Sequence, residues 1–223
     1  MVRVPEVKKM DAFPYELLED PESLGRHHGW TEPVYRDFLA LQRGTLSRAD
    51  FDAEYLTRKA ILNLDLTGFT LSAIQMGSLE SLLRIFDAQK VCIPVLREHG
   101  AGFIRTFADD IIALFEEPGS ALDAALQIHE RIYTFNRSAD SGPNPAEASI
   151  GLGFGEVYAI GPNLAMGAEM NRASKLGEDT ACGGETLATE GVYAELKDRS
   201  DVCFEPERSR DLPFSFHRVR PCR

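Results

Sequence analysis

A short apolar stretch at residues 60–66, Ala-Ile-Leu-Asn-Leu-Asp-Leu, constrains the fold of this chain more than any other segment. Its length and aliphatic composition predict a buried β-strand, and Thr67 and Gly68 predict a turn directly after it. A long amphipathic helix is expected next, because apolar residues recur at helical spacing until Gly100: Leu79, Leu82, Leu83, Phe86, Ile93 and Leu96. A strand followed by such a helix indicates a layered fold, in which helices bury their apolar sides against a sheet.

Later segments extend this pattern. The turn Ala108-Asp109-Asp110 predicts a hairpin, and residues 118–136 have the spacing of a second amphipathic helix. The other expected elements are strands at 102–107, 111–115, 148–154, 157–160, 186–189 and 214–219, and a short helix at 167–176. The order β-α-β-β-α-β predicts an α+β fold, a ferredoxin-like βαββαβ sandwich with its helices on one face of a largely antiparallel sheet.

Residues 1–57 differ in character from the rest of the chain. Residues 33–42 have the pattern of a short helix, and Ser47 is a plausible N-cap for a second helix through Tyr55. No Gly/Ser-rich linker separates this part from the remainder of the chain. We therefore expect an N-terminal helical extension at 1–57 that packs on a main domain at 58–223.

The charge of the chain restricts its partners. Asp and Glu number 35 against 24 Lys and Arg, which gives a formal net charge of −11. Such an acidic surface is a poor match for nucleic acid or for an anionic bilayer. No apolar run reaches the roughly 18 residues of a membrane span, and residues 1–10 lack the apolar core of a signal peptide. We expect a cytoplasmic protein without nucleic-acid or membrane partners.

The four cysteines lie far apart and show no CxxC spacing: Cys92, Cys182, Cys203 and Cys222. In a cytoplasmic protein, cysteines of this kind are reduced and mostly buried. We therefore expect neither a disulfide framework nor a structural zinc site.

Two carboxylates stand out as candidate functional groups. Asp65 ends the first expected strand, and Asp109 lies at the tip of the expected hairpin. In a split β-α-β arrangement these strands are neighbours, so the two aspartates can converge. Paired carboxylates suit hard divalent cations, which can activate an attacking oxygen and hold a triphosphate. The simpler interpretation is that Asp109 and Asp110 are ordinary turn residues. For Asp65 that interpretation is weaker, because a carboxylate at the end of an apolar strand is costly to bury without a partner.

The motifs around these aspartates resemble those of class III adenylate/guanylate cyclase catalytic domains. Residues 65–70, Asp-Leu-Thr-Gly-Phe-Thr, are similar to the family's Asp-Ile-x-Gly-Phe-Thr signature. Residues 100–115 resemble its strand-turn-strand element, and residues 149–157 its Gly-Ile-x-x-Gly-Glu-Val element. Residues 167–176 resemble Gly-Asp-x-Val-Asn-x-Ala-Ser-Arg-Leu. The four motifs occur in the family's order, and the resemblance covers about residues 59–195.

The resemblance implies an activity and a set of roles. Asp65, Leu66 and Asp109 would hold two divalent cations, Mg²⁺ or Mn²⁺, while the ribose 3′-oxygen attacks the α-phosphorus and pyrophosphate leaves. Asn171 would orient the ribose. Lys175 stands where the family has an arginine that neutralises charge on the α-phosphate.

In this family the active site is shared across a head-to-tail dimer. The resemblance therefore implies a homodimer in which the metal residues come from one chain, and Asn171 and Lys175 from the other. It also places the triphosphate on backbone amides of the turn at 66–70, which makes Phe69 and Thr70 substrate-binding residues.

The positions that read the base depart from both purine-specific patterns. Arg105 stands where adenylate cyclases carry Lys and guanylate cyclases Glu, and Leu164 stands where both carry a polar partner. Arginine offers only donors, which suits the carbonyl acceptors of uracil, although the O6/N7 edge of guanine is also all acceptor. With the resemblance to stand-alone bacterial pyrimidine cyclases, this favours UTP over ATP, GTP and CTP, and a second-messenger role in anti-phage defence. The alternative is that Arg105 is a surface arginine paired with a neighbouring acid.

Other departures from the family support a second hypothesis, a cyclase-fold domain that binds nucleotide or dimerises without turnover. Lys175 cannot form the bidentate contacts of arginine, Ala168 replaces a common Asp, and the loop at 161–166 is short. Retention of Asp65, Asp109 and Asn171 favours the enzyme.

Overall fold

The computed structural model of the protein describes residues 17–26, 29–68, 74, 77–138, 145–161 and 164–222. The chain divides into two compact units, Met1–Phe51 and Asp52–Arg223, and each is described by itself.

The first unit is helical. It contains α1 (Pro21–Gly25), α2 (Glu32–Gln42) and the start of α3 (Arg48–Tyr55), so the two expected helices are confirmed and α1 is added. Ser47 is the expected N-cap, since its Oγ accepts a hydrogen bond from the Asp50 amide at 3.1 Å. Aromatic side chains pack this unit together: the ring centroid of Phe38 lies 4.8 Å from that of Trp30 and 5.1 Å from that of Phe51.

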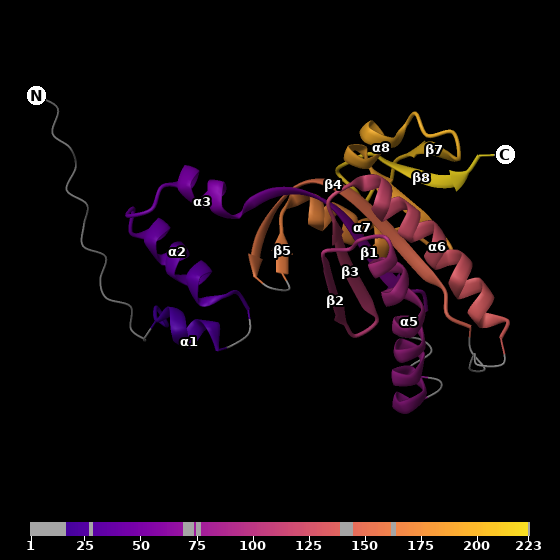
Figure 1. The fold of residues 1–223 in the computed structure, drawn as a ribbon, viewed down its shortest axis with the longest axis horizontal. Coiled ribbons are helices and arrows are strands. Elements are labelled where there is room, and N and C mark those ends of the chain that lie inside the picture. Colours follow the sequence, from indigo (N-terminus) through magenta and orange to yellow (C-terminus); the bar gives the residue numbers. More distant parts are fainter. Residues whose placement is uncertain are drawn as a thin grey trace, which may run out of the picture. The chain divides into compact units, whose positions relative to one another are not determined.

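The second unit is a single mixed sheet with helices against it (Figure 1). Its strands are β1 (Leu56–Leu66), β2 (Phe103–Phe107), β3 (Asp110–Phe115), β4 (Ala148–Gly161), β5 (Leu164–Met166), β6 (Thr186–Thr189), β7 (Val202–Glu207) and β8 (Phe216–Pro221). Its helices are α5 (Ser78–Glu98), α6 (Pro118–Asn136), α7 (Ala168–Asp179) and α8 (Glu190–Leu196). The strands lie in the order β2-β3-β1-β4-β6-β8-β7, and β5 pairs with β4. Only the β4–β6 pair is parallel among the described pairs.

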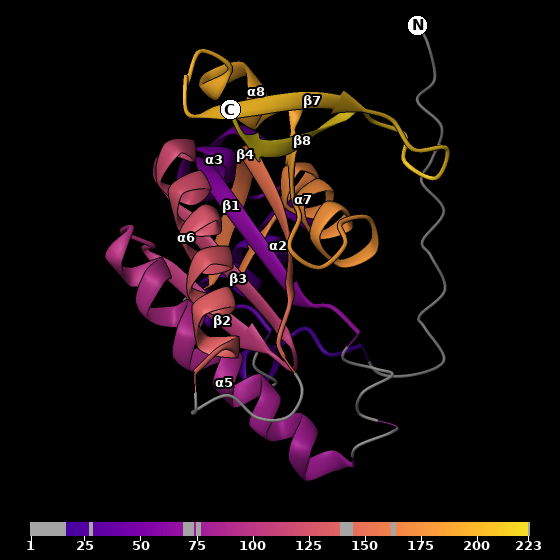
Figure 2. The same ribbon diagram turned by 90° about the vertical axis from the view of Figure 1, so that its right-hand side faces the viewer.

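Helices cover both faces of the sheet, so the expectation that they lie on one face is wrong (Figure 2). Alternate residues of β1 show the division. Leu62 and Leu64 pack in one core with residues of α5 and α6, whereas Ile61 packs in another with Met170 and Ala173 of α7. The helix α7 therefore lies on the face opposite α5 and α6.

The glycines of β4 explain why α7 docks there. A Cβ atom on Gly151 would lie 2.0 Å from the carbonyl oxygen of Ala173, and one on Gly153 would lie 3.2 Å from the Cβ of Ala173. The bare backbone of β4 thus lets the helix backbone approach closely. This glycine-rich stretch is therefore a packing surface for α7.

Several predicted boundaries change in the structure. β4 is one continuous strand rather than two, because Gly155 and Glu156 pair with Lys59 and Arg58 of a β1 that starts earlier than expected. Near the C-terminus the sequence patterns missed α8 and β7, and β8 lies two residues later than predicted.

The helix α5 is where it was expected, but the first half of its apolar pattern does not face the core. Four of the residues that defined the pattern are more than half exposed: Leu79, Leu82, Leu83 and Phe86. The buried side instead carries Ser81, Arg84, Ala88, Cys92, Val95 and Leu96. Among the helices in the described part of the chain, none has the length and apolarity needed to cross a bilayer.

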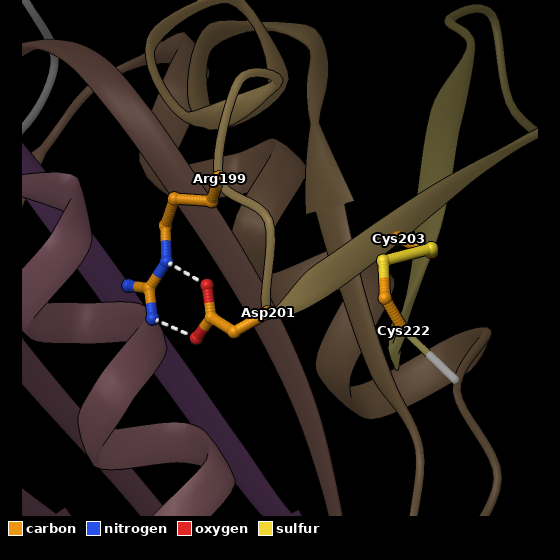
Figure 3. The surroundings of a disulfide bond; sticks show 4 residues. All are labelled: Arg199, Asp201, Cys203 and Cys222. Carbon is orange, nitrogen blue, oxygen red and sulfur yellow. Dashed lines mark hydrogen bonds and ion pairs between the residues drawn. A yellow bond between two sulfur atoms is a disulfide. The ribbon is translucent and has the colours of Figure 1, made fainter.

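A disulfide joins Cys203 to Cys222, so the expectation that all four cysteines are reduced is wrong (Figure 3). Cys203 lies in β7 and Cys222 directly follows β8; these strands pair, which leaves the two Cα atoms 5.1 Å apart. The two residues are 19 apart in sequence, and only the strand pairing brings them together. Cys92 is free and buried, and Cys182 is free and exposed.

The loop between α8 and β7 is also fastened to the rest of the unit. Arg199 donates from Nε to Asp201 at 2.9 Å, and its Nη1 forms an ion pair with Asp123 of α6 at 2.7 Å. Together with the disulfide, these contacts fix the C-terminal hairpin.

Candidate metal site

Three carboxylates gather where β1 ends. The β1–β3 register pairs Leu64 with Ile111, so Asp65 comes next to Asp110, and Asp109 precedes β3 in the hairpin turn. One carboxylate oxygen from each of these three aspartates lies within 4.8 Å of the others, and all three residues are half-buried. The predicted convergence of Asp65 and Asp109 is therefore present. Hereafter Asp65, Asp109 and Asp110 are called the acidic triad.

Asp110 is the member of the triad that sequence reasoning missed as a site residue. The sequence indicates it only as half of a turn pair, because local patterns do not contain the strand register that places it beside Asp65. The turn itself is tight, because Ala108 has φ +50°, in the left-handed region that favours glycine. The chain reverses over Ala108 and Asp109, so that Phe107 pairs with Asp110 at the start of β3.

Negative charge is concentrated at the triad, and it shifts the pKa values of its members. Burial raises the pKa of Asp65 to about 6, with further upward contributions from the charges of Asp109 and Glu178. Burial also raises the pKa of Asp110 to about 6, helped by Glu178, Asp65 and Asp109. Hydrogen bonding to the Leu66 backbone and to Asp110 partly offsets this rise in the pKa of Asp65. Clustered oxygen donors of this kind fit Mg²⁺ or Mn²⁺, which prefer carboxylate ligands.

A polar link connects this region to α7. Asn63 is fully buried in β1, and its Nδ2 donates to Ser174 Oγ at 3.1 Å and to Glu178 Oε1 at 2.9 Å. Glu178 is itself exposed, yet its charge acts on both Asp65 and Asp110. Neither Asn63 nor Glu178 was identified from the sequence, because no short motif connects them.

Asn171 and Lys175 both belong to α7. Both are exposed on α7, and Lys175 forms an ion pair with Asp179, which raises the pKa of the lysine. In the described part of the chain, neither residue makes a hydrogen bond or an ion pair with the triad. Among the described residues, the two groups of predicted site residues are therefore not joined by a direct polar contact.

The other predicted site residues have mixed outcomes. Arg105 is partly buried in β2, with its guanidinium carbon 5.9 Å from the ring centroid of Phe107, and within the described residues it forms no ion pair with an acid. The side chain of Leu66 is buried, so only its backbone is available to a ligand. Phe69, Thr70 and the side chain of Leu164 lie outside the described residues.

No protein-family model matches this sequence, and no curated protein matches it. Solved structures do match. The adenylyl cyclase CyaB from P. aeruginosa superposes with a TM-score of 0.64 and 16% identity, covering 75% of this chain and 97% of that one. The guanylate cyclase domain of RhGC from Catenaria anguillulae, solved in complex with GTP, superposes with a TM-score of 0.63 and 18% identity, covering 74% and 97%.

A third match is the catalytic core of a rhodopsin-guanylyl cyclase with converted specificity, in complex with ATPαS. It has a TM-score of 0.64 and 19% identity, and covers 74% of this chain and 98% of that one. The chain therefore has the mixed α+β fold of adenylyl and guanylyl cyclase catalytic domains, which confirms the predicted fold class.

Proposed function

We propose that this protein is a divalent-metal-dependent nucleotidyl cyclase, which converts a nucleoside triphosphate to its 3′,5′-cyclic monophosphate and pyrophosphate. The acidic triad at the end of β1 is the observation that carries this proposal, because it stands in a fold shared with adenylyl and guanylyl cyclases. Asp65 and Asp109 are the proposed ligands of two cations, with Asp110 beside them and the Leu66 carbonyl as a backbone ligand. Mg²⁺ or Mn²⁺ bound there would lower the pKa of the ribose hydroxyl and offset the charge of the triphosphate.

The reaction balances without a further reagent. The ribose 3′-oxygen loses its proton to water and forms a bond to the α-phosphorus. The bond from that phosphorus to the oxygen that bridges to the β-phosphate breaks, and pyrophosphate leaves with its electron pair. Asn171 orients the ribose by hydrogen bonding. The Lys175 ammonium carries the positive charge that stabilises the α-phosphate oxygens in the transition state.

We propose that the working unit is a homodimer with shared sites. Among the described residues, neither Asn171 nor Lys175 makes a direct polar contact with the triad, and this supports an arrangement in which a complete site takes α7 from a second copy. The Lys175–Asp179 ion pair would open when the partner chain presents a nucleotide, since an exposed pair of this kind contributes little stability.

Complementation between two inactive variants tests the shared site. We expect Asp65→Asn and Lys175→Ala each to abolish turnover. An equimolar mixture of the two variants is expected to regain about a quarter of the wild-type sites, because half of the dimers would hold one intact site. A mixture that forms mixed dimers but stays inactive would contradict shared sites. An active monomer would contradict them as well.

The proposed substrate is UTP. Arg105 is the polar group on β2 expected at the base, and it offers only hydrogen-bond donors, which match the carbonyl acceptors of uracil. The test supplies ATP, GTP, CTP and UTP separately with Mn²⁺ and identifies each product by mass spectrometry. We expect cyclic UMP to dominate and Arg105→Gln to reduce that preference. Cyclic AMP or cyclic GMP as the main product would refute the base assignment and leave the cyclase reaction intact. The proposed place in anti-phage defence rests on the resemblance to stand-alone pyrimidine cyclases, and loss of protection in cells that carry Asp65→Asn would test it.

The alternative function is a nucleotide-binding or dimerisation module without turnover. The Lys175–Asp179 ion pair favours it, because it occupies the only cation proposed for the α-phosphate. Under this alternative, the wild-type protein makes no cyclic product from any of the four nucleotides although the dimer is intact and Mn²⁺ is bound.

A further inference from the structure

Arg84 is a buried cation on α5 that donates hydrogen bonds to two loops next to the acidic triad. Only 9% of the residue is exposed. Its Nη2 donates to the carbonyl oxygen of Thr67 at 3.0 Å and to that of Pro145 at 3.3 Å. Thr67 follows directly after β1, and Pro145 lies three residues before β4. The guanidinium therefore joins the loops at the ends of the two central strands.

Packing alone does not account for an arginine at this place. The buried side of α5 continues with Ala88, Cys92, Val95 and Leu96, which belong to the main core. Burying a guanidinium is costly unless hydrogen bonds compensate for lost water, whereas an aliphatic side chain of similar length would carry no such cost. The arginine is consistent with a need to hold the two carbonyl groups.

The carbonyl of Thr67 belongs to a turn whose peptide planes are fixed from two sides. The Thr67 amide donates to the Glu147 carbonyl at 2.9 Å, and because a peptide unit is planar, this bond also orients the Leu66 carbonyl. Arg84 holds the next peptide unit by its oxygen. In a trans peptide the N–H points away from the carbonyl, so the Gly68 amide is directed to the side opposite Arg84. Gly68 has φ +71°, a conformation that glycine adopts readily.

We propose that Arg84 is a positioning residue for the metal and triphosphate site. It acts by fixing the orientation of the Thr67–Gly68 peptide unit, which follows Asp65 in the chain. This inference rests on the proposed function, in which the Leu66 carbonyl binds a cation, and on the expectation from the resemblance that backbone amides of the turn bind phosphate. Misplacement of such groups by about 1 Å can lower catalysis by roughly 100-fold. Loss of Arg84 therefore weakens the binding of metal and nucleotide as well as turnover.

The test compares Arg84→Met and Arg84→Lys in the full chain, with Arg97→Met as the matched control, because Arg97 is exposed on the same helix. Mn²⁺ affinity is measured by electron paramagnetic resonance without nucleotide, and turnover by the KM for nucleotide, kcat and the half-activating Mn²⁺ concentration. We expect Arg84→Met to raise the Mn²⁺ dissociation constant, the half-activating concentration and KM by about tenfold or more. Arg84→Lys is expected to fall between this variant and the wild type, since one ammonium can reach a carbonyl. Arg97→Met is expected to match the wild type.

The outcomes separate this inference from the proposed function. If folded Arg84→Met, or folded Arg84→Lys where the first variant unfolds, keeps the wild-type Mn²⁺ affinity and KM and only lowers the active fraction, Arg84 is structural and the inference is wrong. If the wild type forms no cyclic nucleotide, the proposed function fails, and weaker Mn²⁺ binding in the folded variants still supports the positioning role at the metal site.

Discussion

Asn63 donates a hydrogen bond from its buried Nδ2 to Glu178 Oε1 at 2.9 Å, and this bond connects the strand that carries Asp65 to the helix that carries Asn171 and Lys175. It holds a carboxylate near the acidic triad, where the Glu178 charge raises the pKa of both Asp65 and Asp110. The strand with Asp65 and the helix with Asn171 and Lys175 are thus linked through the side chain of Asn63, which also donates to Ser174 of α7.

The first prediction concerns the charge of Glu178. In Glu178→Gln the amide oxygen can still accept from Asn63, but the repulsion on the triad is removed. We expect the metal-free variant to melt at a higher temperature than the wild type at pH 7, and this difference to shrink as the pH falls below about 6, where Asp65 and Asp110 take up protons. Glu130→Gln, an exposed change on α6, serves as the control. Equal melting temperatures at pH 7 would mean that Glu178 does not act on the triad.

The second prediction concerns pH and metal. Asp65 and Asp110 have pKa values of about 6 in the folded chain against 3.8 ordinarily, so the folded state holds these protons more tightly than the unfolded state. The metal-free protein therefore loses stability as the pH rises from about 4 to about 6, and the loss persists above that range. Mn²⁺ needs the deprotonated carboxylates, so its stabilising effect grows over the same range.

Thermal melts with and without Mn²⁺ across pH 4.5 to 8 check this, in steps of about half a unit. In the wild type we expect the Mn²⁺-induced increase in melting temperature to appear as the pH rises through about 6. In Asp110→Asn we expect a smaller increase, together with higher metal-free stability at pH 7. An Mn²⁺ effect that is independent of pH, or unchanged in Asp110→Asn, would place the metal elsewhere.

The third prediction concerns the disulfide between Cys203 and Cys222. A cross-link over 19 residues restricts the unfolded chain, and its loss costs roughly 3 kcal/mol of unfolding free energy. We expect Cys222→Ser to melt several degrees lower, while Cys182→Ser, which changes an exposed free thiol, melts as the wild type does. Thiol titration of the denatured, unreduced protein is expected to detect Cys92 and Cys182 only. Titration of all four thiols without a reductant would show that the bond does not form.

The sequence predicts more of the acidic site itself than of the residues around it. The sequence indicates Asp65 and Asp109 because local patterns place the first at the end of a strand and the second at the tip of a hairpin, and the split β-α-β order makes those strands neighbours. Asp110 required the β1–β3 register, and Glu178 required the docking of α7, neither of which local periodicity contains. The residues predicted to be buried in the first half of α5 are wrong. Arg84 is buried there because of its hydrogen bonds, whereas hydrophobic periodicity treats an arginine as exposed.

The last prediction concerns the backbone contact that places α7. A methyl group on Gly151 would lie 2.0 Å from the Ala173 carbonyl oxygen and 2.5 Å from the Gly177 amide nitrogen, so Gly151→Ala pushes the helix away from β4. We expect a loss of about 1–3 kcal/mol in unfolding free energy, measured by urea denaturation. Gly119→Ala is the control, because it adds a methyl group in open space on α6. Because α7 carries Asn171 and Lys175, we also expect the folded fraction of Gly151→Ala to lose cyclase activity while it keeps Mn²⁺ affinity at the triad. Unchanged stability in Gly151→Ala would mean that α7 does not lie against β4 as closely as this structure has it.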